Sequence, residues 1–366
     1  MYESIRPVLF RLGAEAAHHA AVLGARIGQT VVPGVIESRF SYAHPALHQM
    51  VFGRAFTNPI GIAAGFDKNA TMIPFWKRAG CGFVEVGSVT AKKSKGNPRP
   101  RAFRLPDDRA LVNRMGLNND GVEKIAPRVS KHTRDPAFTV GVNIAKTHDP
   151  SIEGEAAVED FCATFRRVAP LAHYVALNIS CPNTREGKTF EDPNVLDDLL
   201  RAVMAERREH APRVPILVKF SPPDETEFVF DSLYEELLLV TTAHGVDGYI
   251  ASNTAADRDG LQTSPERLNE IGAGGLSGRP VAERSTALVR YIYRKTEGEC
   301  PIIGVGGIDS PEAAYAKIKA GASLLQVYTG LVYEGPGLIR TLKKGIVELM
   351  AEEGHSSIGA AVGIEA

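Results

Sequence analysis

The sequence has few of the features that mark several common classes of protein. Its 366 residues include only four cysteines, and no two of them form a C-x-x-C pair. It therefore offers neither a zinc ribbon nor the thiolate cluster of an iron–sulfur centre. The 42 basic and 43 acidic residues leave a net charge of -1, so no global positive field exists to gather a nucleic acid. We expect no resident metal ion and no nucleic-acid partner.

Long apolar runs are also absent. No stretch reaches the length that spans a bilayer, and charged residues and histidines interrupt the N-terminal segment where a signal peptide would be apolar. The 44% hydrophobic and 23% charged composition, with no low-complexity tract, excludes a collagen, a coiled coil and a mostly disordered chain. We expect a folded protein that stays inside the cell, in a reducing compartment.

Short apolar segments bounded by turn residues recur along the chain and predict strands. These eight segments span residues 58–65, 82–89, 139–145, 174–180, 215–221, 248–254, 301–307 and 324–330. Segments of helical period lie between and after them, at residues 71–79, 121–132, 156–169, 192–210, 225–243, 281–295, 311–320 and 336–350. Continuously apolar strands are buried on both faces, so eight strand–helix units that close on themselves predict a (β/α)8 TIM barrel. An open doubly wound sheet is the alternative.

Residues 1–57 lie outside this eightfold pattern. Apolar residues at helical spacing predict two short amphipathic helices there, separated by a break at residues 12–13. The helices are either a cap docked on the barrel or an interfacial anchor with Arg6, Arg11 and Arg26 near lipid head groups. The expected organisation is an N-terminal helical extension and lead-in over residues 1–57, a barrel domain over 58–352 and a C-terminal tail over 353–366.

A second segment outside the pattern is the insertion at residues 90–119, between the second strand and its helix. Six basic residues are interleaved with prolines in it: Lys92, Lys93, Lys95, Arg99, Arg101 and Arg104. A run of charge is usually a solvated surface, so we predict a solvated loop.

Polar residues gather where the predicted strands end. In a TIM barrel the chemistry is built from the C-terminal ends of the strands and from the loops that follow them. Two lysines and several amides at one mouth would be costly to bury without a ligand, so they imply a polar one. The residues at these ends are Asp67, Lys68, Ser88, Asn143, Asn178, Cys181, Asn183, Lys219, Ser252, Asn253, Thr254, Gly306, Gly307, Tyr328 and Thr329.

A glycine cluster after the seventh strand predicts a phosphate site. Gly306 and Gly307 let the backbone approach an anion at the start of the next helix. Together with Tyr328 and Thr329 after the last strand, they match the loops where TIM barrels hold a cofactor phosphate. The glycine-rich stretch at 272–278 lacks the third glycine of a dinucleotide fingerprint, which favours a mononucleotide such as FMN over NAD.

Two residues at the mouth are candidates for direct chemistry. Lys219 would place a positive charge where a flavin ring becomes anionic on accepting a hydride. Cys181 lies among amides, and an ordinary thiol, with a pKa of about 8.5, needs only modest activation to act as a base near neutral pH. Lys68 is a candidate to hold a substrate carboxylate, with Arg114 as a second. We interpret His18 as a surface or helix residue and the other three cysteines as core residues.

Five motifs resemble those of the dihydroorotate dehydrogenase family, and they run nearly from end to end. They are residues 63–68 (AAGFDK), 113–118 (NRMGLN), 178–183 (NISCPN), 275–280 (GLSGRP) and 303–308 (IGVGGI). The helical extension is similar to that of class 2, the membrane-associated, quinone-using branch. The resemblance implies an FMN barrel that oxidises (S)-dihydroorotate to orotate in pyrimidine (UMP) biosynthesis and passes electrons to ubiquinone or menaquinone under a helical collar. It also implies a peripheral location on the cytoplasmic side of the inner membrane.

The same resemblance assigns roles to individual residues. The catalytic base falls on Cys181, which would remove a proton from C5 of the substrate, and Lys219 would offset charge on the reduced ring. The FMN contacts fall on Ala64, Gly65, Lys68, Ser88, Asn143, Asn178, Lys219, Ser252, Gly278, Gly307, Tyr328 and Thr329. The substrate contacts fall on Lys68, Asn113, Arg114, Met115, Gly116, Leu117, Asn178, Asn183, Asn253 and Thr254.

The sequence departs from class 2 at the base, because that branch usually carries serine there and the soluble class 1 enzymes carry cysteine. The electron acceptor is therefore open between a quinone and the fumarate or NAD of class 1, and residues 1–57 favour the quinone. Two further alternatives are a flavin barrel that reduces pyrimidines in RNA and a non-catalytic barrel that binds phosphate.

Overall fold

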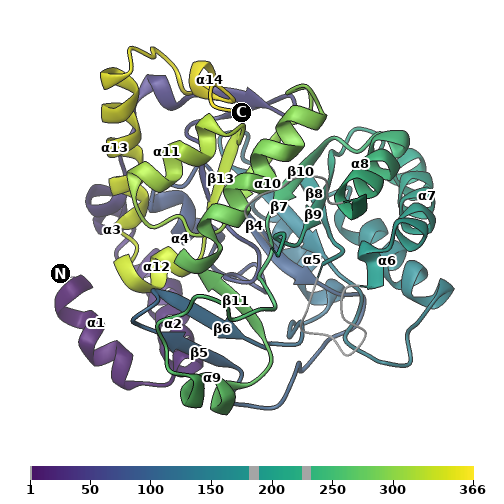
Figure 1. Cartoon of the computed structure of the whole chain (residues 1–366), viewed down its shortest axis with the longest axis horizontal. Coiled ribbons are helices and arrows are strands. Elements are labelled where there is room, and N and C mark those ends of the chain that lie inside the picture. The colour runs from purple at the N-terminus through teal and green to yellow at the C-terminus, as the bar shows by residue number, and fades with distance from the viewer. Residues whose placement is uncertain (1, 181–188, 225–231) are drawn as a thin grey trace.

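Eight parallel strands form a closed barrel at the centre of the protein, in a computed structural model that describes residues 2–180, 189–224 and 232–366 (Figure 1). In order around the barrel they are β3 (Ile60–Ile62), β4 (Phe83–Val89), β7 (Thr139–Ile144), β8 (Tyr174–Asn178), β9 (Ile216–Phe220), β10 (Gly248–Ala251), β12 (Ile302–Val305) and β13 (Leu324–Val327). Leu325 of β13 pairs with Ile60 of β3, which closes the barrel. Each predicted strand segment contains one of these strands. The prediction of a (β/α)8 barrel is confirmed, and the open sheet is wrong.

Helices cover the outside of the barrel, and each predicted helical segment overlaps one of them. They are α4 (Ile73–Arg78), α5 (Val122–Ser130), α6 (Glu155–Val168), α7 (Pro193–His210), α8 (Ser232–His244), α10 (Ala282–Lys295), α11 (Pro311–Lys319), α12 (Thr329–Glu334) and α13 (Leu338–Glu352). Side-chain caps fix two of the starts. Asp192 accepts hydrogen bonds from the first backbone N–H groups of α7, and Ser310 accepts one from the N–H of Ala313 in α11.

A short hairpin closes the N-terminal end of the barrel. Strands β1 (Gln49–Val51) and β2 (Arg54–Phe56) pair antiparallel, and Phe56 packs edge-on against Phe83, with ring centroids 5.6 Å apart. Phe56 joins the apolar side chains that fill the barrel interior. This end is therefore filled, and the opposite end, where the strands finish, is left for ligands.

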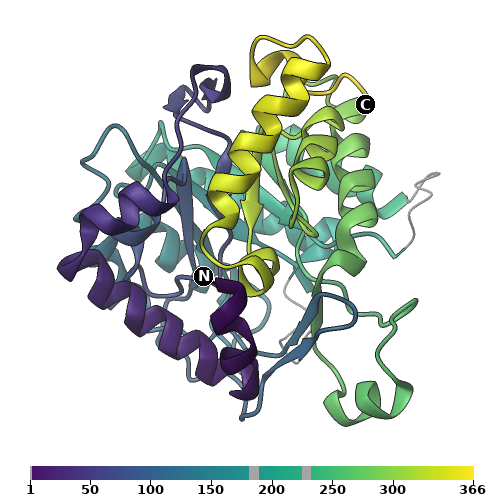
Figure 2. The same cartoon turned by 90° about the vertical axis from the view of Figure 1, so that its left-hand side faces the viewer.

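Three helices precede the barrel and lie along one side of it (Figure 2). The first, α1 (Tyr2–Arg11), packs against α12, and α2 (Ala14–Val31) packs against α4. The third, α3 (Pro33–Phe40), was not predicted, and it begins where a proline occupies the first turn. Arg6 donates to the carbonyl of Tyr333 at 2.9 Å, so it is turned towards the barrel rather than to a lipid surface. Within the described ranges, no helix is both long enough and apolar enough to cross a membrane.

The prediction of a solvated loop at residues 90–119 is wrong for residues 102–113, whereas Lys92, Lys93, Lys95 and Arg99 are exposed as expected. Part of this insertion forms β5 (Ala102–Leu105) and β6 (Ala110–Asn113), which pair antiparallel with each other, and β6 also pairs antiparallel with β11 (Gly275–Gly278). The strands bury a small apolar core of their own, in which Val112 and Leu276 are fully buried. The charges misled the prediction because Arg101 is 5% exposed and bonded to Glu15 of α2 at 2.8 Å. Helix α9 (Pro265–Ile271) packs on the same core.

The residues after α13 return to the barrel. Helix α14 (Ile358–Ala361) buries Ile358 completely, and the carboxylate of Glu365 lies 2.6 Å from Lys319 Nζ on α11. Residues 353–366 are thus packed against α11. The boundaries at residues 57 and 352 stay a prediction.

Candidate active site

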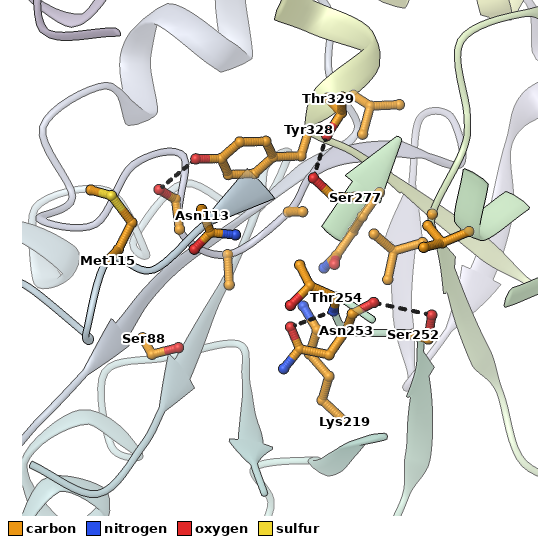
Figure 3. Close-up of a pocket in the computed structure, with 18 of the residues that line it drawn as sticks. Ser88, Asn113, Met115, Lys219, Ser252, Asn253, Thr254, Ser277, Tyr328 and Thr329 are labelled. Carbon is orange, nitrogen blue, oxygen red and sulfur yellow. Dashed lines mark hydrogen bonds between the residues drawn. The ribbon is translucent and has the colours of Figure 1, made fainter. Parts of the chain in front are cut away.

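A cavity opens at the C-terminal end of the barrel, and most of the predicted site residues line it (Figure 3). Lys219 rises from β9 at its floor, and Tyr328 and Thr329 lie at the start of α12. The predicted residues in the lining are Ala64, Gly65, Lys68, Ser88, Asn113, Met115, Gly116, Leu117, Asn178, Lys219, Ser252, Asn253, Thr254, Gly278, Gly307, Tyr328 and Thr329. As expected for a TIM barrel, the C-terminal ends of the strands therefore bring together residues that are up to 265 positions apart, from Ala64 to Thr329.

Two predicted residues turn their side chains away from this cavity. Asn143 is fully buried below it, donates to Glu85 at 3.0 Å and accepts a hydrogen bond from the Ser88 hydroxyl. The Arg114 guanidinium donates to the carbonyls of Ile271 and Ala273 and so fastens β6 to the segment before β11. Neither side chain therefore contacts a ligand in this cavity directly, and each instead holds residues that line it. Cys181 and Asn183 lie outside the described residues.

Sequence reasoning missed three polar residues of the lining. Gln326 lies in β13 and donates to Glu85 at 2.8 Å, and Ser277 belongs to the unpredicted strand β11. Asn118 ends the motif at residues 113–118. Gln326 carried a readable signal, since a single polar residue interrupts an apolar strand there.

A chain of hydrogen bonds fixes the amides at the mouth. Asn178 Nδ2 donates to Ser88 Oγ at 2.9 Å, and Asn253 Nδ2 donates to Asn178 Oδ1 at 3.1 Å and to Ser180 Oγ at 2.9 Å. The Ser180 hydroxyl in turn donates to the carbonyl of Lys219 at 3.0 Å. The chain joins the ends of β4, β8, β9 and β10. Each amide is therefore held in one orientation before any ligand binds.

Glycines form a cradle on the opposite wall. Gly278 and Gly307 have positive φ angles of 106° and 69°. A Cβ atom on Gly307 would lie 2.6 Å from Ala282 Cα, so only glycine fits there. The hydroxyls of Ser277 and Thr329 lie 2.9 Å apart beside the cradle. Exposed backbone N–H groups and hydroxyls suit a phosphate.

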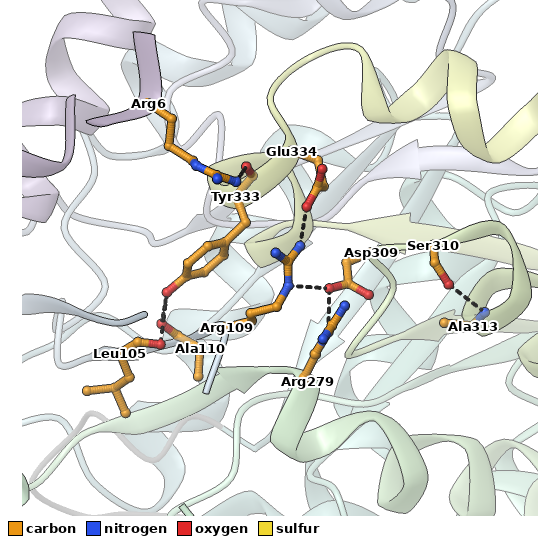
Figure 4. Close-up of polar contacts among 10 residues, drawn as sticks. All are labelled: Arg6, Leu105, Arg109, Ala110, Arg279, Asp309, Ser310, Ala313, Tyr333 and Glu334. Carbon is orange, nitrogen blue, oxygen red and sulfur yellow. Dashed lines mark hydrogen bonds and ion pairs between the residues drawn. The ribbon is translucent and has the colours of Figure 1, made fainter. Parts of the chain in front are cut away.

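An ion-pair cluster holds the loops around this cradle (Figure 4). Asp309 follows the glycine loop and accepts from Arg109 Nε at 3.0 Å and from Arg279 Nε at 2.8 Å. Arg109 also pairs with Glu334, at the end of α12. Tyr333 fixes the other side, with its hydroxyl 2.8 Å from the carbonyl of Ala110. The cluster ties the β5–β6 hairpin, the glycine loop and α12 into one frame.

A second cavity of about 370 Å³ lies between the N-terminal helices and the barrel. Its lining is mostly apolar, and it shares Lys68, Asn113, Met115, Ser277 and Tyr328 with the first cavity, so the two adjoin.

His18 lies on α2, as expected, but it faces the second cavity instead of solvent. Its ring packs edge-on against Phe66 with centroids 5.2 Å apart. Burial lowers the pKa of His18 to about 3, with the positive charge of Lys68 a smaller cause. His18 therefore stays neutral at physiological pH.

The model of the family described as dihydroorotate dehydrogenase matches residues 46–350. This chain belongs to the dihydroorotate dehydrogenase family. Three curated relatives, each named dihydroorotate dehydrogenase (quinone), align with all of this chain. That of Roseiflexus castenholzii is 43% identical and 97% covered, that of Nocardia farcinica 41% identical and 97% covered, and that of Haloarcula marismortui 40% identical and 99% covered.

A solved structure agrees with this assignment. The crystal structure of DHODH from Eimeria tenella in complex with ferulenol has a TM-score of 0.87 and 30% sequence identity, and the match covers 99% of this chain and 98% of that one. The predicted family and its quinone-using branch are therefore confirmed.

Dihydroorotate dehydrogenases depend on a flavin, and the first cavity fits one. Three of the residues that line it carry a buried polar atom with no hydrogen-bond partner in the described part of the chain: Asn118 Oδ1, Thr254 Oγ1 and Gln326 Oε1. Buried polar atoms rarely stay unpaired, so they indicate a ligand that carries N–H or O–H groups. The glycine cradle and the charge of Lys219 suit the phosphate and the electron-accepting ring. Among the described residues, no group of three His, Cys, Asp or Glu is placed to hold a metal ion.

Proposed function

We propose that this enzyme oxidises (S)-dihydroorotate to orotate with FMN as its cofactor and passes the electrons to ubiquinone or menaquinone, in pyrimidine biosynthesis. The observation that carries the proposal is the pair of adjoining cavities. The first lies at the barrel mouth and carries amides, hydroxyls and two lysines, and the second is mostly apolar and lies under the N-terminal helices. Membership of the family and the quinone-using relatives support the same reaction.

The cofactor would be held by both walls of the first cavity. Gly278, Gly307, Tyr328 and Thr329 would bind its phosphate through backbone and hydroxyl donors. Ala64, Gly65, Lys68, Ser88, Asn178, Lys219 and Ser252 would surround its ring, with Asn143 supporting Ser88 from below. When bound, FMN supplies a hydride acceptor. The ammonium group of Lys219 places a positive charge at the floor, where negative charge develops.

The substrate would lie above the ring, between two groups of side chains. The segment at 113–117 covers one side, and Asn178, Asn253 and Thr254 offer amide and hydroxyl groups on the other. These groups match the alternating C=O and N–H groups of a dihydropyrimidine ring. Arg114 supports this arrangement by anchoring its own segment rather than by reaching the cavity.

We place the general base at Cys181, with Asn183 as a further substrate contact. Both follow directly from Ser180 in the motif at residues 178–183. The thiolate of Cys181 would take the proton from C5 of dihydroorotate. The fixed amides of Asn178 and Asn253 hold the substrate so that this proton faces one direction only.

The purified protein should contain FMN, because the glycine cradle offers a site for one phosphate beside a cavity lined by amides, hydroxyls and two lysines. Anaerobic addition of dihydroorotate should bleach the visible flavin absorbance, and denaturation should release FMN. These two properties are measured by absorbance and by chromatography of the released flavin. A colourless protein, or one that releases FAD, would contradict the cofactor assignment.

Affinity for orotate should fall as the pH rises above about 8, because the bound carboxylate needs the charged form of Lys68. Burial, and to a smaller extent the charge of Arg101, lowers the pKa of Lys68 to about 8. Above that pH the free enzyme has lost the proton that the complex must take up, so Kd should rise by up to about tenfold per pH unit. Titration of orotate against the oxidised enzyme between about pH 6.5 and 9.5 measures this slope.

The matched variant for that experiment is Lys68→Met. It should bind orotate roughly ten- to a hundredfold more weakly at neutral pH, with a Kd that no longer rises with pH. A parent Kd that stays constant across the range would show that Lys68 does not bind the carboxylate.

We place the enzyme on the cytoplasmic face of the inner membrane, attached peripherally through its N-terminal helices. Twelve large apolar side chains are exposed among the described residues, and eight of them fall between Ile5 and Val35. They are Ile5, Val8, Leu12, Leu23, Ile27, Val31, Val32 and Val35. Such a concentration suits an interfacial helix surface, with the exposed Arg11 and Arg26 near lipid head groups. A quinone would then enter the second cavity from the lipid.

A further inference from the structure

One buried ammonium group has no part in the site described above. Lys317 lies on α11 with 1% of its surface exposed. Its Nζ donates to Thr286 Oγ1 at 2.8 Å, to Ser285 Oγ at 3.0 Å and to the carbonyl of Ala282 at 3.4 Å. All three acceptors are neutral, and no ion pair joins Lys317 to a carboxylate in the described part of the chain. Burial lowers the pKa of Lys317 to about 7. A buried cation without an ion-pair partner lowers the stability of the fold, so we expect Lys317 to serve a function.

The groups that hold Lys317 also hold the glycine loop. Ser285 accepts from Lys317 and donates to the carbonyl of Val305 at 2.6 Å, directly before Gly306. A Cβ atom on Gly307 would lie 2.6 Å from Ala282 Cα, so the first residue of α10 touches that glycine. One residue, Ala282 or Ser285, therefore separates the ammonium group from the glycine cradle.

The alkyl part of the Lys317 side chain packs against β12, the strand that leads to the cradle. A Cβ atom on Gly304 would lie 2.6 Å from Lys317 Cδ, so the strand that leads to the cradle leaves room for this side chain. Lys317, Gly306 and Gly307 also line one groove between α10 and α11.

The two arginines of the ion-pair cluster beside the cradle are neutralised. Arg279 pairs with Asp309, and Arg109 pairs with both Asp309 and Glu334. A phosphate monoester carries about two negative charges at neutral pH, and backbone N–H groups supply only partial positive charges. Lys317 is thus a cation next to the cradle that no carboxylate pairs with, among the residues that the structure describes.

We propose that Lys317 is a positioning residue for the cofactor phosphate. Its ammonium group holds the first turn of α10 against Gly306 and Gly307, and it adds positive charge behind the phosphate cradle. The inference rests on the proposed FMN site. It predicts that Lys317 acts on the phosphate of the cofactor and not on its ring.

The test compares FMN with riboflavin, which has the same ring and no phosphate. In the full-length protein, Lys317→Met removes the charge and keeps the length of the stem. After removal of bound flavin, titration should show an FMN Kd raised roughly ten- to a hundredfold and a riboflavin Kd changed by less than about twofold. Equal weakening of both ligands would show a merely structural role and overturn the proposal.

Lys343→Met is the matched control. Lys343 is also 1% exposed, its Nζ donates to the carbonyl of Gly80 at 2.6 Å, and it lines neither the first cavity nor the groove between α10 and α11. Its loss should leave the preference for FMN over riboflavin unchanged. If Lys317→Met does not fold, Thr286→Val removes one anchor of the ammonium group and should lower the same preference by a smaller factor.

The outcomes separate this inference from the proposed function. A parent protein that binds neither FMN nor riboflavin would refute the proposed function. A parent that binds FMN, with a Lys317→Met variant that keeps the parent's preference for FMN, would refute the role of Lys317 alone.

Discussion

Replacing Cys181 by alanine should slow the reduction of bound flavin by dihydroorotate by roughly two to four powers of ten, the usual contribution of a positioned base. The reduction should fail at proton removal, since the side chain that we propose as the acceptor of the C5 proton is gone. Orotate binding should change little, because Asn178 and Asn253 hold each other and keep their orientation. Stopped-flow absorbance of the flavin under anaerobic conditions measures the rate, and an orotate titration measures the binding.

Cys181→Ser is the finer test of the same base. A hydroxyl is a much weaker acid than a thiol, so the serine variant should keep reduced activity, and the alkaline rise of its flavin-reduction rate should move to higher pH. The shift in pH profile distinguishes a change of base from a general disturbance of the site. If the alanine variant reduces its flavin at the parent rate, the base lies elsewhere in the chain.

The barrel could be predicted because its strands are buried on both faces. Segments such as the one at 215–221 read as continuous apolar runs, and the turn residues that follow them mark the strand ends. Once the strands are known, the barrel rule places their C-terminal ends at one mouth. Lys68 and Lys219 are far apart in the sequence, and this rule alone assigns them to one site, whose cavity they both line.

The parts of the fold and of the site that were not predicted depend on contacts between distant segments, which the sequence does not show. The charges of Arg101 and Arg104 suggest solvent, but Arg101 is buried against Glu15 and Arg104 stacks on Phe10 of the N-terminal helix. Arg114 lies in a motif of the family and Asn143 in the third predicted strand, yet local hydrogen bonds decide where their side chains point. Lys317 gave no signal at all, because a lysine at helical spacing reads as a surface residue until the packing of α10 is known.

The two proposed half-reactions use different parts of the chain. None of the described residues that line the first cavity comes from residues 1–40, whereas α1, α2 and α3 all contribute to the second cavity. Reduction of the flavin and its reoxidation by a quinone should therefore be separable by mutation.

A matched pair of point variants should show this separation without disturbing the fold. Ala21 lines the second cavity on α2, and the neighbouring Ala20 is exposed and lines neither cavity. Ala21→Trp should fill part of the cavity and lower kcat/KM for a long-chain quinone, whereas Ala20→Trp should leave it unchanged. Neither variant should alter flavin reduction by dihydroorotate. Equal quinone kinetics in both variants would place the quinone elsewhere.

Deletion of residues 1–40 should have the larger effect. Without the three helices the second cavity loses one of its walls, so reduction of a long-chain quinone should fall by roughly a hundredfold or more, while flavin reduction by dihydroorotate stays near the parent rate. The exposed apolar side chains between Ile5 and Val35 go with the helices, so the truncated protein should also stop pelleting with membrane vesicles. Flavin content must be measured alongside, because Tyr2 donates to the carbonyl of Val332 at 2.6 Å and so contacts the helix that begins at Thr329. A truncated enzyme that keeps its flavin, reduces the quinone at the full rate and still pellets with vesicles would show that the helices are neither the quinone site nor the membrane anchor.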